Sequence, residues 1–334
     1  MKIAFTCVVG LILIASSTAQ RPKEDQSASA VPQPQVAAFD WRESWRNATT
    51  ALGQVGHDSL INRDFFSAVG TGVLISTAPD TAYLVTAKHV LCDPDKRPGW
   101  YPSQLNVRFA WQDRKSIYAA LGITVPLRTE GSPIWFTLDD ESDVAVLKFF
   151  SPDEINKRLP ENDRQTDRIN IIGAENLEAD VYEGEQVLVF GFPALAGNDR
   201  LARILVRQGI VAWTDPTIPS DRVFLVDANL YLGNSGGPVI KFPFGLMKDG
   251  HVNYVSGGAP KLLGIVSQVT AQDLTATFTA PPIGKLESHG QIAGVGSIGI
   301  IEPASKVLKL LTMAKEGTAK AGTCEVNETK AVKK

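Results

Sequence analysis

The chain has 334 residues, of which 44% are hydrophobic, and carries a formal net charge of -3 from 33 basic and 36 acidic side chains. This length and apolar content suffice for a buried core in one large or two small domains. The near balance of charge offers no electrostatic attraction to a polyanion or a membrane surface, so the composition argues against nucleic acid as a partner.

The N-terminus has the pattern of a secretory signal peptide. Met-Lys precedes an apolar run over residues 3–15, and small residues follow up to Ala19. A membrane anchor is the alternative, but the run is shorter than the roughly 20 residues that span a bilayer. We therefore predict a signal peptide over 1–19, no stable membrane insertion, and a secreted or periplasmic protein.

The next segment, 20–39, is rich in Gln, Pro, Ser and Ala, and this composition predicts a disordered leader or linker. From residue 40 onward, short apolar runs broken by Gly, Pro, Asn and Asp indicate many β-strands. The expected strands are 68–76, 82–86, 104–110, 144–150, 186–190, 203–213, 223–226, 238–241 and 262–269.

A charged and polar interval divides these strands into two groups. We expect an N-terminal β-barrel over 40–160, a connector over 161–180, and a C-terminal β-barrel with a helix over 181–314. The helix is expected at 303–314, where a proline near the start precedes apolar positions at helical spacing. The polar, Lys-rich stretch 315–334 predicts a flexible tail.

Three cysteines are present, and Cys7 would leave with the signal peptide. Export would permit a disulfide between the remaining two, Cys92 and Cys324, but nothing local in the sequence brings them together, so the bridge stays open. Neither a CxxC pair nor a Cys/His cluster at metal-ligand spacing occurs, so we predict no metal and no cofactor.

Three local motifs occur in order along the chain. They are Leu84-Val-Thr-Ala-Lys-His-Val90, Ser142-Asp-Val-Ala-Val-Leu147 and Gly233-Asn-Ser-Gly-Gly-Pro238. Together they resemble the trypsin-like serine peptidases, especially the bacterial and HtrA-like branch, over roughly residues 45–312. The resemblance implies a mainly β, chymotrypsin-like fold of two antiparallel, six-stranded-type barrels. The residues after Ser235 are needed to finish the second barrel, so we expect no PDZ module.

The resemblance assigns His89, Asp143 and Ser235 as the catalytic triad, in the order His, Asp, Ser of the chymotrypsin arrangement. A serine hydroxyl is a weak nucleophile at neutral pH, so His89 would take its proton, and Asp143 would hold the imidazole in the productive tautomer. The N–H groups of Gly233 and Ser235 would form the oxyanion hole.

Each assignment has a competitor. Asp143 competes with the acidic cluster 139–141, which also fits a solvated loop, but only Asp143 directly precedes an apolar run. Gly-Asn-Ser-Gly-Gly by itself is typical of a turn. It also matches the G-x-S-x-G elbow of α/β-hydrolase esterases. That fold needs a helix directly after the serine, and the sequence from Pro238 does not offer one.

The resemblance also points to residues that would bind a substrate. An edge strand would pair with the substrate backbone, and residues just before the nucleophile would line the pocket for the side chain at the cleaved position. The candidates are Val266, Ser267 and Gln268 for the strand, and Asn229, Leu230, Tyr231 and Leu232 for the pocket. None of the pocket residues is acidic, which argues against a preference for Lys or Arg.

We therefore predict a secreted serine endopeptidase that hydrolyses polypeptides through an acyl-enzyme intermediate. The alternative is a catalytically silent trypsin-like scaffold that binds peptides or a partner protein. Asn234 stands where digestive enzymes carry an aspartate, so activation by an ion pair with a new N-terminus is not expected. The oligomeric state stays open.

Overall fold

In the computed structural model, the folded part of the chain lies within Asp40–Lys334. The predicted signal peptide (1–19) and leader (20–39) lie outside the described residues. The residues that the structure describes are 41–60, 62–93, 100–112, 118–139, 141–158, 169–178, 180–193, 204–215, 217, 222–241, 245–246, 252–253, 260–270, 273–279, 287–293 and 298–324.

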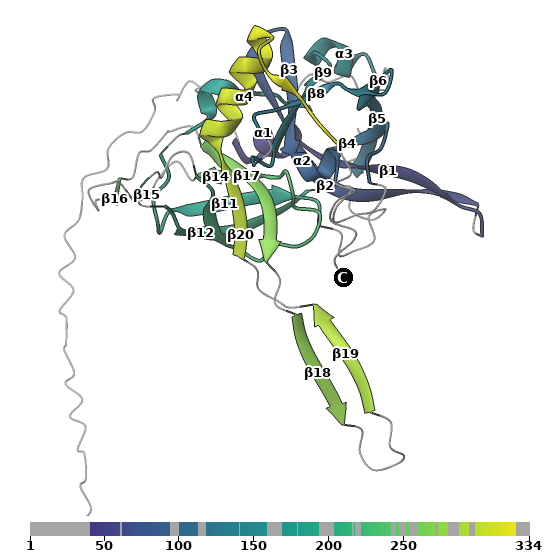
Figure 1. The fold of residues 1–334 in the computed structure, drawn as a ribbon, viewed down its shortest axis with the longest axis vertical. Helices are drawn as coiled ribbons and strands as arrows, with labels where there is room; N and C mark the ends of the chain where they lie inside the picture. The colour runs from purple at the N-terminus through teal and green to yellow at the C-terminus, as the bar shows by residue number, and fades with distance from the viewer. Residues whose placement is uncertain are drawn as a thin grey trace, which may run out of the picture. The chain divides into compact units, whose positions relative to one another are not determined.

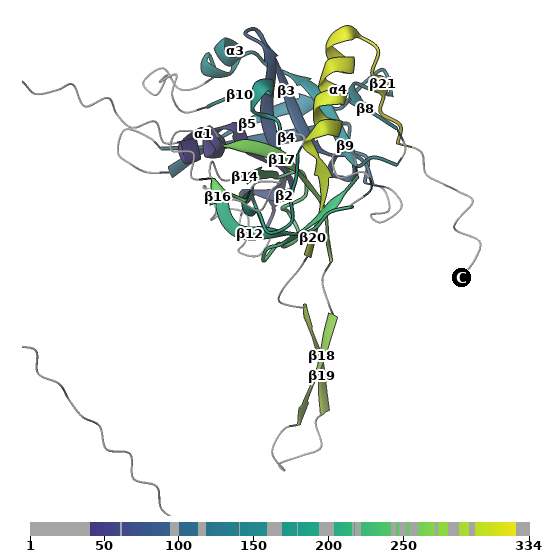
Figure 2. The ribbon, with the colours of Figure 1, turned by 90° about the vertical axis from the view of Figure 1, so that its left-hand side faces the viewer.

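The N-terminal half, together with β21 from the C-terminal end, forms a nine-stranded sheet in the order β21-β8-β9-β3-β2-β1-β4-β5, with β10 paired to β2 (Figure 1 and Figure 2). The pairs along this order are antiparallel, whereas β10 runs parallel to β2. The elements are α1 (Trp41–Ala48), β1 (Thr49–Asp58), β2 (Arg63–Ala78), β3 (Thr81–Ala87), α2 (Lys88–Leu91), β4 (Gln104–Gln112), β5 (Tyr118–Pro126), β6 (Arg128–Thr129), β7 (Ser132–Pro133), β8 (Trp135–Thr137), β9 (Val144–Phe149), α3 (Pro152–Asn156), β10 (Ile172–Gly173) and the 3-10 helix η2 (Ala174–Asn176).

The C-terminal half contains a closed barrel in the order β11-β12-β13-β20-β17-β14, and Figures 1 and 2 label most of its strands. Two small hairpins, β15 with β16 and β18 with β19, form separate two-stranded sheets. The elements are β11 (Gln186–Gly191), β12 (Leu205–Trp213), β13 (Phe224–Asp227), β14 (Pro238–Lys241), β15 (Gly245–Leu246), β16 (Val252–Asn253), β17 (Lys261–Thr270), β18 (Asp273–Thr279), β19 (Glu287–Ala293), β20 (Ile298–Pro303), α4 (Ala304–Glu316) and β21 (Lys320–Ala321).

Strand β9 shows why the central strands have continuous apolar sequences. Val144 and Val146 belong to the apolar cluster that includes α4 and β17, whereas Ala145 and Leu147 belong to the cluster that includes β4 and β5. Successive side chains of a strand point to opposite faces. Both faces of β9 are therefore buried, and an unbroken apolar run is the pattern that such a strand requires.

Helix α4 follows β20 directly. Pro303 is its N-cap, and Gly317 ends it in the left-handed conformation with φ 72°, which a residue without Cβ adopts at little cost. Val307, Leu310 and Leu311 lie on one face and are buried. The helix contacts β8 and β9 of the sheet and β17 and β20 of the barrel, so it packs against both halves.

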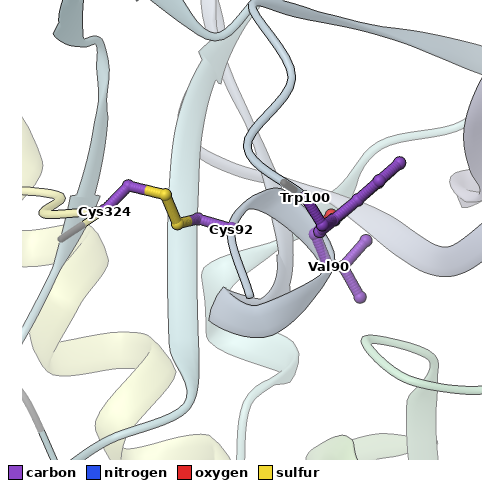
Figure 3. Close-up of a disulfide and its surroundings, with 4 residues drawn as sticks. All are labelled: Val90, Cys92, Trp100 and Cys324. Atoms are coloured by element: carbon purple, nitrogen blue, oxygen red, sulfur yellow. A yellow bond between two sulfur atoms is a disulfide. The ribbon is translucent and has the colours of Figure 1, made fainter. Parts of the chain in front are cut away.

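Part of the expected flexible tail is held in the fold. After α4, strand β21 pairs with β8, and Cys324 forms a disulfide with Cys92, at a Cα–Cα distance of 5.8 Å. Figure 3 shows this bridge at the end of α2, the short helix that carries Val90. The carbonyl of Val90, which lies in this helix, accepts a hydrogen bond from the indole Nε1 of Trp100 at 3.1 Å. Residues 325–334 lie outside the described residues.

The mainly β fold with a C-terminal helix is confirmed, and one of its two strand groups closes as a six-stranded barrel. Each run that was expected to be a strand lies largely within an observed strand. Several observed strands lie outside the expected runs, β1 and β20 among them. β1 contains two glycines and several polar residues, and its ten-residue ladder with β2 defines it. β20 completes the barrel between β13 and β17, and its apolar run Ile298-Gly-Ile-Ile301 was not among the expected strands.

Candidate active site

His89 lies in α2, immediately after β3. The backbone of α2 is attached to the residue before β9, because Lys88 N–H donates to the carbonyl of Asp143 at 3.0 Å, and His89 N–H donates to Asp143 Oδ1 at 3.0 Å. Val90 and Leu91 of this helix are buried in an apolar cluster, which fixes the helix to the core. The position of His89 is therefore set by the Asp143 segment as well as by its own strand.

The side chains of His89 and Asp143 meet directly. His89 Nδ1 lies 2.8 Å from Asp143 Oδ2, and the hydroxyl of Ser267 donates to the same oxygen at 2.6 Å. Burial alone would raise the pKa of Asp143, but the hydrogen bond and charge of His89 and the hydrogen bond of Ser267 lower the pKa below its ordinary value. An ionised Asp143 only accepts hydrogen bonds. Nδ1 of His89 is therefore the donor in this contact, and in a neutral imidazole with that tautomer Nε2 is the acceptor.

The contact of Ser267 with Asp143 was missed at the level of sequence. Ser267 was predicted only as part of the strand that pairs with substrate, and its hydroxyl instead buttresses the carboxylate from β17. A buried serine in an apolar strand, as in Ile265-Val266-Ser267, is a polar group that needs a partner. That signal identifies the need for a partner but not which residue supplies it.

Ser235 lies in a buried loop that is clamped between the two halves of the fold. Its carbonyl accepts a hydrogen bond from Thr71 N–H of β2 at 2.7 Å, and Gly236 N–H donates to Val266 O of β17 at 2.6 Å. Gly236 has φ 82°, and a Cβ there would lie 2.1 Å from Thr71 O and 2.9 Å from Ala87 N. The serine loop therefore touches the residue from which α2 starts, and Ser235 lies beside the His89 segment.

The loop around Ser235 has a distinctive backbone hydrogen-bond pattern. Gly233 has φ 95°, and its carbonyl accepts from the Thr71 hydroxyl at 2.7 Å. Asn234 N–H donates to Tyr231 O, and Gly237 N–H donates to Asn234 O. Within the described ranges, no acceptor takes the N–H of Gly233 or of Ser235. Two free donors around a serine are the arrangement that an oxyanion hole requires.

The hydroxyl of Ser235 is not hydrogen-bonded to His89 in the part of the chain that the structure describes, where His89 makes its hydrogen bonds to Asp143. Such contacts are often long in enzymes without substrate and tighten only when the substrate is bound. The described geometry therefore provides a His–Asp pair, a neighbouring buried serine and two free N–H donors, which together can support acyl transfer.

The predicted pocket residues differ in their exposure. Leu230 is buried and packs over Gly299, where a Cβ would lie 2.4 Å from Leu230 Cδ1. Tyr231 is half-buried beneath the guanidinium of Arg207. Asn229 and Leu232 are exposed, the latter at 76%. A bulky apolar side chain, Leu230, thus lies at the position closest to the barrel interior.

The predicted substrate strand is only partly available. The N–H of Val266 donates to Gly237 O, and its carbonyl accepts from Gly236, so the Val266 backbone is already bonded to the serine loop, which corrects its expected role in pairing with substrate. β14 pairs with β17 only as far as Ile265. From Ser267 onward, that edge of β17 has no partner strand among the described residues, and the exposed Gln268 lies on it.

The described residues contain no group of three or more His, Cys, Asp or Glu side chains that could hold a metal ion. In the same part of the chain, no helix combines the length and apolar character needed to cross a membrane.

Comparison with known proteins gives two findings. The profile of the trypsin-like peptidase domain matches residues 70–243, which is more than half of the chain. Proteins named serine protease HtrA-like, from Staphylococcus aureus strains USA300, NCTC 8325 / PS 47 and COL, are each 26% identical over 208 residues. The match covers 58% of this chain and 22% of each relative, so the chain spans about a fifth of their length.

Proposed function

Because this chain belongs to the trypsin-like peptidase family, we propose that it is a serine endopeptidase in which Ser235 is the nucleophile, His89 the general base and acid, and Asp143 the group that orients His89. The observation that carries the proposal is the 2.8 Å contact between His89 Nδ1 and Asp143 Oδ2 beside the buried Ser235 loop. This contact leaves His89 Nε2 as the acceptor on the side of the imidazole away from Asp143.

The reaction follows from these positions. As Ser235 Oγ forms a bond with the scissile carbonyl carbon, His89 Nε2 takes the hydroxyl proton. The negative oxygen of the tetrahedral intermediate accepts hydrogen bonds from the N–H groups of Gly233 and Ser235. When the C–N bond breaks, His89 gives its proton to the leaving amine. Water then attacks the acyl ester with His89 again as base, which releases the acid and restores Ser235.

The substrate is proposed to be an extended polypeptide. The unpaired edge at Ser267 and Gln268 of β17 can accept a backbone as an added strand. The predicted pocket contains no carboxylate, and the buried Leu230 reduces the space for a long side chain. Cleavage after small or medium apolar residues is therefore favoured over cleavage after Lys or Arg.

We further propose that the protein is exported. The N-terminal pattern of residues 1–19 and the Cys92–Cys324 disulfide support this, because disulfides persist in oxidising compartments.

The test is labelling of the purified mature protein with a fluorophosphonate probe, beside Ser235→Ala and His89→Ala, with casein cleavage measured in parallel. We expect wild type to label at Ser235 and to cleave casein, while both folded variants do neither. A folded wild-type protein that does not label would contradict the proposal and would leave the non-catalytic peptide-binding scaffold.

A further inference from the structure

A buried glutamate lies behind Asp143. Glu302 is near the end of β20, and its side chain is only 4% exposed. One carboxylate oxygen, Oε1, accepts a hydrogen bond from the backbone N–H of Asp143 at 2.9 Å. The other, Oε2, lies 2.9 Å from Nζ of Lys306, four residues later in α4. A chain of contacts thus runs from α4 through β20 to Asp143.

The Asp143 backbone is positioned by residues outside its own strand. The ladder between β3 and β9 begins with Ala87 and Val144, so Asp143 lies just before it. Its carbonyl accepts from Lys88, and its carboxylate accepts from His89 and Ser267. The N–H is bonded to Glu302 instead. Each hydrogen-bonding group of Asp143 is therefore engaged, and Glu302 supplies the contact from the last strand of the barrel.

Burying a carboxylate is costly unless it is paired and hydrogen-bonded. A neutral acceptor would satisfy one backbone N–H at lower cost, so the presence of a charged one needs a reason. A charge-assisted hydrogen bond is shorter and stronger than a neutral one. The positive charge of Lys306 compensates the buried negative charge of Glu302. Without Lys306, Glu302 would place a second uncompensated negative charge near Asp143.

We infer that Glu302, supported by Lys306, is a positioning residue that holds the Asp143 peptide so that its carboxylate stays aligned with His89. The inference rests on the proposed function of His89 and Ser235. Without the acceptor, the buried N–H of Asp143 loses its partner, and the peptide is free to shift. Misplacement of a catalytic group by about 1 Å can cost on the order of 100-fold in rate.

The test compares Glu302→Ala with Glu302→Gln, whose amide oxygen can still accept from Asp143 N–H. The control is Glu185→Ala, because Glu185 is also buried, with its side chain 1% exposed, and is also paired with a lysine, Lys241, but contacts neither His89 nor Asp143. For each protein, the labelling rate constant of the fluorophosphonate probe, the final labelled fraction and the thermal midpoint are measured.

We expect Glu302→Ala to lower the labelling rate constant by roughly 10- to 100-fold while the labelled fraction stays complete. Glu302→Gln should recover the rate to within a few-fold of wild type, and Glu185→Ala should keep the wild-type rate whatever its thermal midpoint. If Glu302→Ala does not fold, Glu302→Met fills a similar volume without an acceptor and should show the same loss of rate.

Three outcomes would overturn the inference while leaving the proposed function intact: a wild-type rate in Glu302→Ala or Glu302→Met, no recovery in Glu302→Gln, or a reduced labelled fraction at an unchanged rate constant. The last result would indicate a purely structural role. A wild-type protein that does not label at all refutes the proposed function first, so the two failures are distinguishable.

Discussion

The disulfide between Cys92 and Cys324 can be removed by Cys324→Ser, or by the double variant with Cys92→Ser, which leaves no free thiol. The bridge joins residues separated by 232 positions. For a closed loop of that length, the chain-entropy relation gives about 5.5 kcal/mol of stabilisation at 25 °C, and removal of native disulfides typically costs about 2 to 5 kcal/mol. We therefore expect the free energy of unfolding to fall by about 3 to 5 kcal/mol.

A loss of this size is a large part of the roughly 5 to 15 kcal/mol by which domains are stable. The assay is equilibrium urea unfolding of the mature chain from Gln20 onward, with the double variant, oxidised wild type and reduced wild type compared by extrapolated free energy. Reduced wild type should match the double variant. The extrapolated free energy is compared instead of the midpoint alone, because removing a cross-link also changes the slope.

The same variant affects the site. Cys92 N–H donates to Lys88 O, so the bridged residue closes the helix that carries His89. A modest decrease in the rate constant of probe labelling should therefore accompany the loss of stability. Two free thiols in denatured, unreduced wild type would show that the bridge does not form. A loss below about 1 kcal/mol would show that the loop-closure reasoning does not apply to this chain.

Two further predictions concern the serine loop and the barrel. Gly236→Ala should lower the free energy of unfolding by about 2 to 4 kcal/mol and nearly abolish probe labelling, because φ is 82° and the new Cβ would lie 2.1 Å from Thr71 O. Gly131→Ala is the matched control, since φ is 83° with nothing within 4 Å, and should cost only about 1 to 2 kcal/mol without loss of labelling. Equal effects of the two substitutions would refute the argument. Burial raises the pKa of Glu185 above 4.5, an effect that Lys241 only partly offsets. The stability that this group contributes is therefore present below pH 4.5 and lost as pH rises through the raised pKa. The free energy of unfolding, measured by urea unfolding from pH 4 to 8, should therefore not show this decrease in Glu185→Gln. The same pH dependence in Glu185→Gln as in wild type would contradict the raised pKa of Glu185.

The strands could be predicted where both faces or one face of a strand are buried, because burial imposes an apolar pattern on the local sequence. β9 is an example, since its run from Val144 is explained by two apolar clusters, one on each side. β1 could not be predicted in this way. Its glycines and polar residues carry no apolar pattern, and its ladder with β2 comes from pairing with a partner strand.

The sequence motifs single out two residues, His89 and Asp143, that are in contact in the structure. Asp143 precedes an apolar run, and in the structure it lies one residue before β9, within 2.8 Å of His89. The prediction that the Val266 backbone pairs with substrate does not hold, because its N–H and carbonyl are bonded to Gly237 and Gly236. That outcome depends on the path of the serine loop, which the local sequence does not reveal.

By itself, the sequence determined the family resemblance, the mainly β character, the C-terminal helix and the order of His89, Asp143 and Ser235. These follow from short motifs and from the period of apolar residues, which are local properties. The tertiary structure alone decided that Cys92 meets Cys324, that Ser267 donates to Asp143, and that Glu302 lies behind it. Such contacts join residues more than a hundred positions apart, and only the packing of α4 and the barrel against the sheet brings them together.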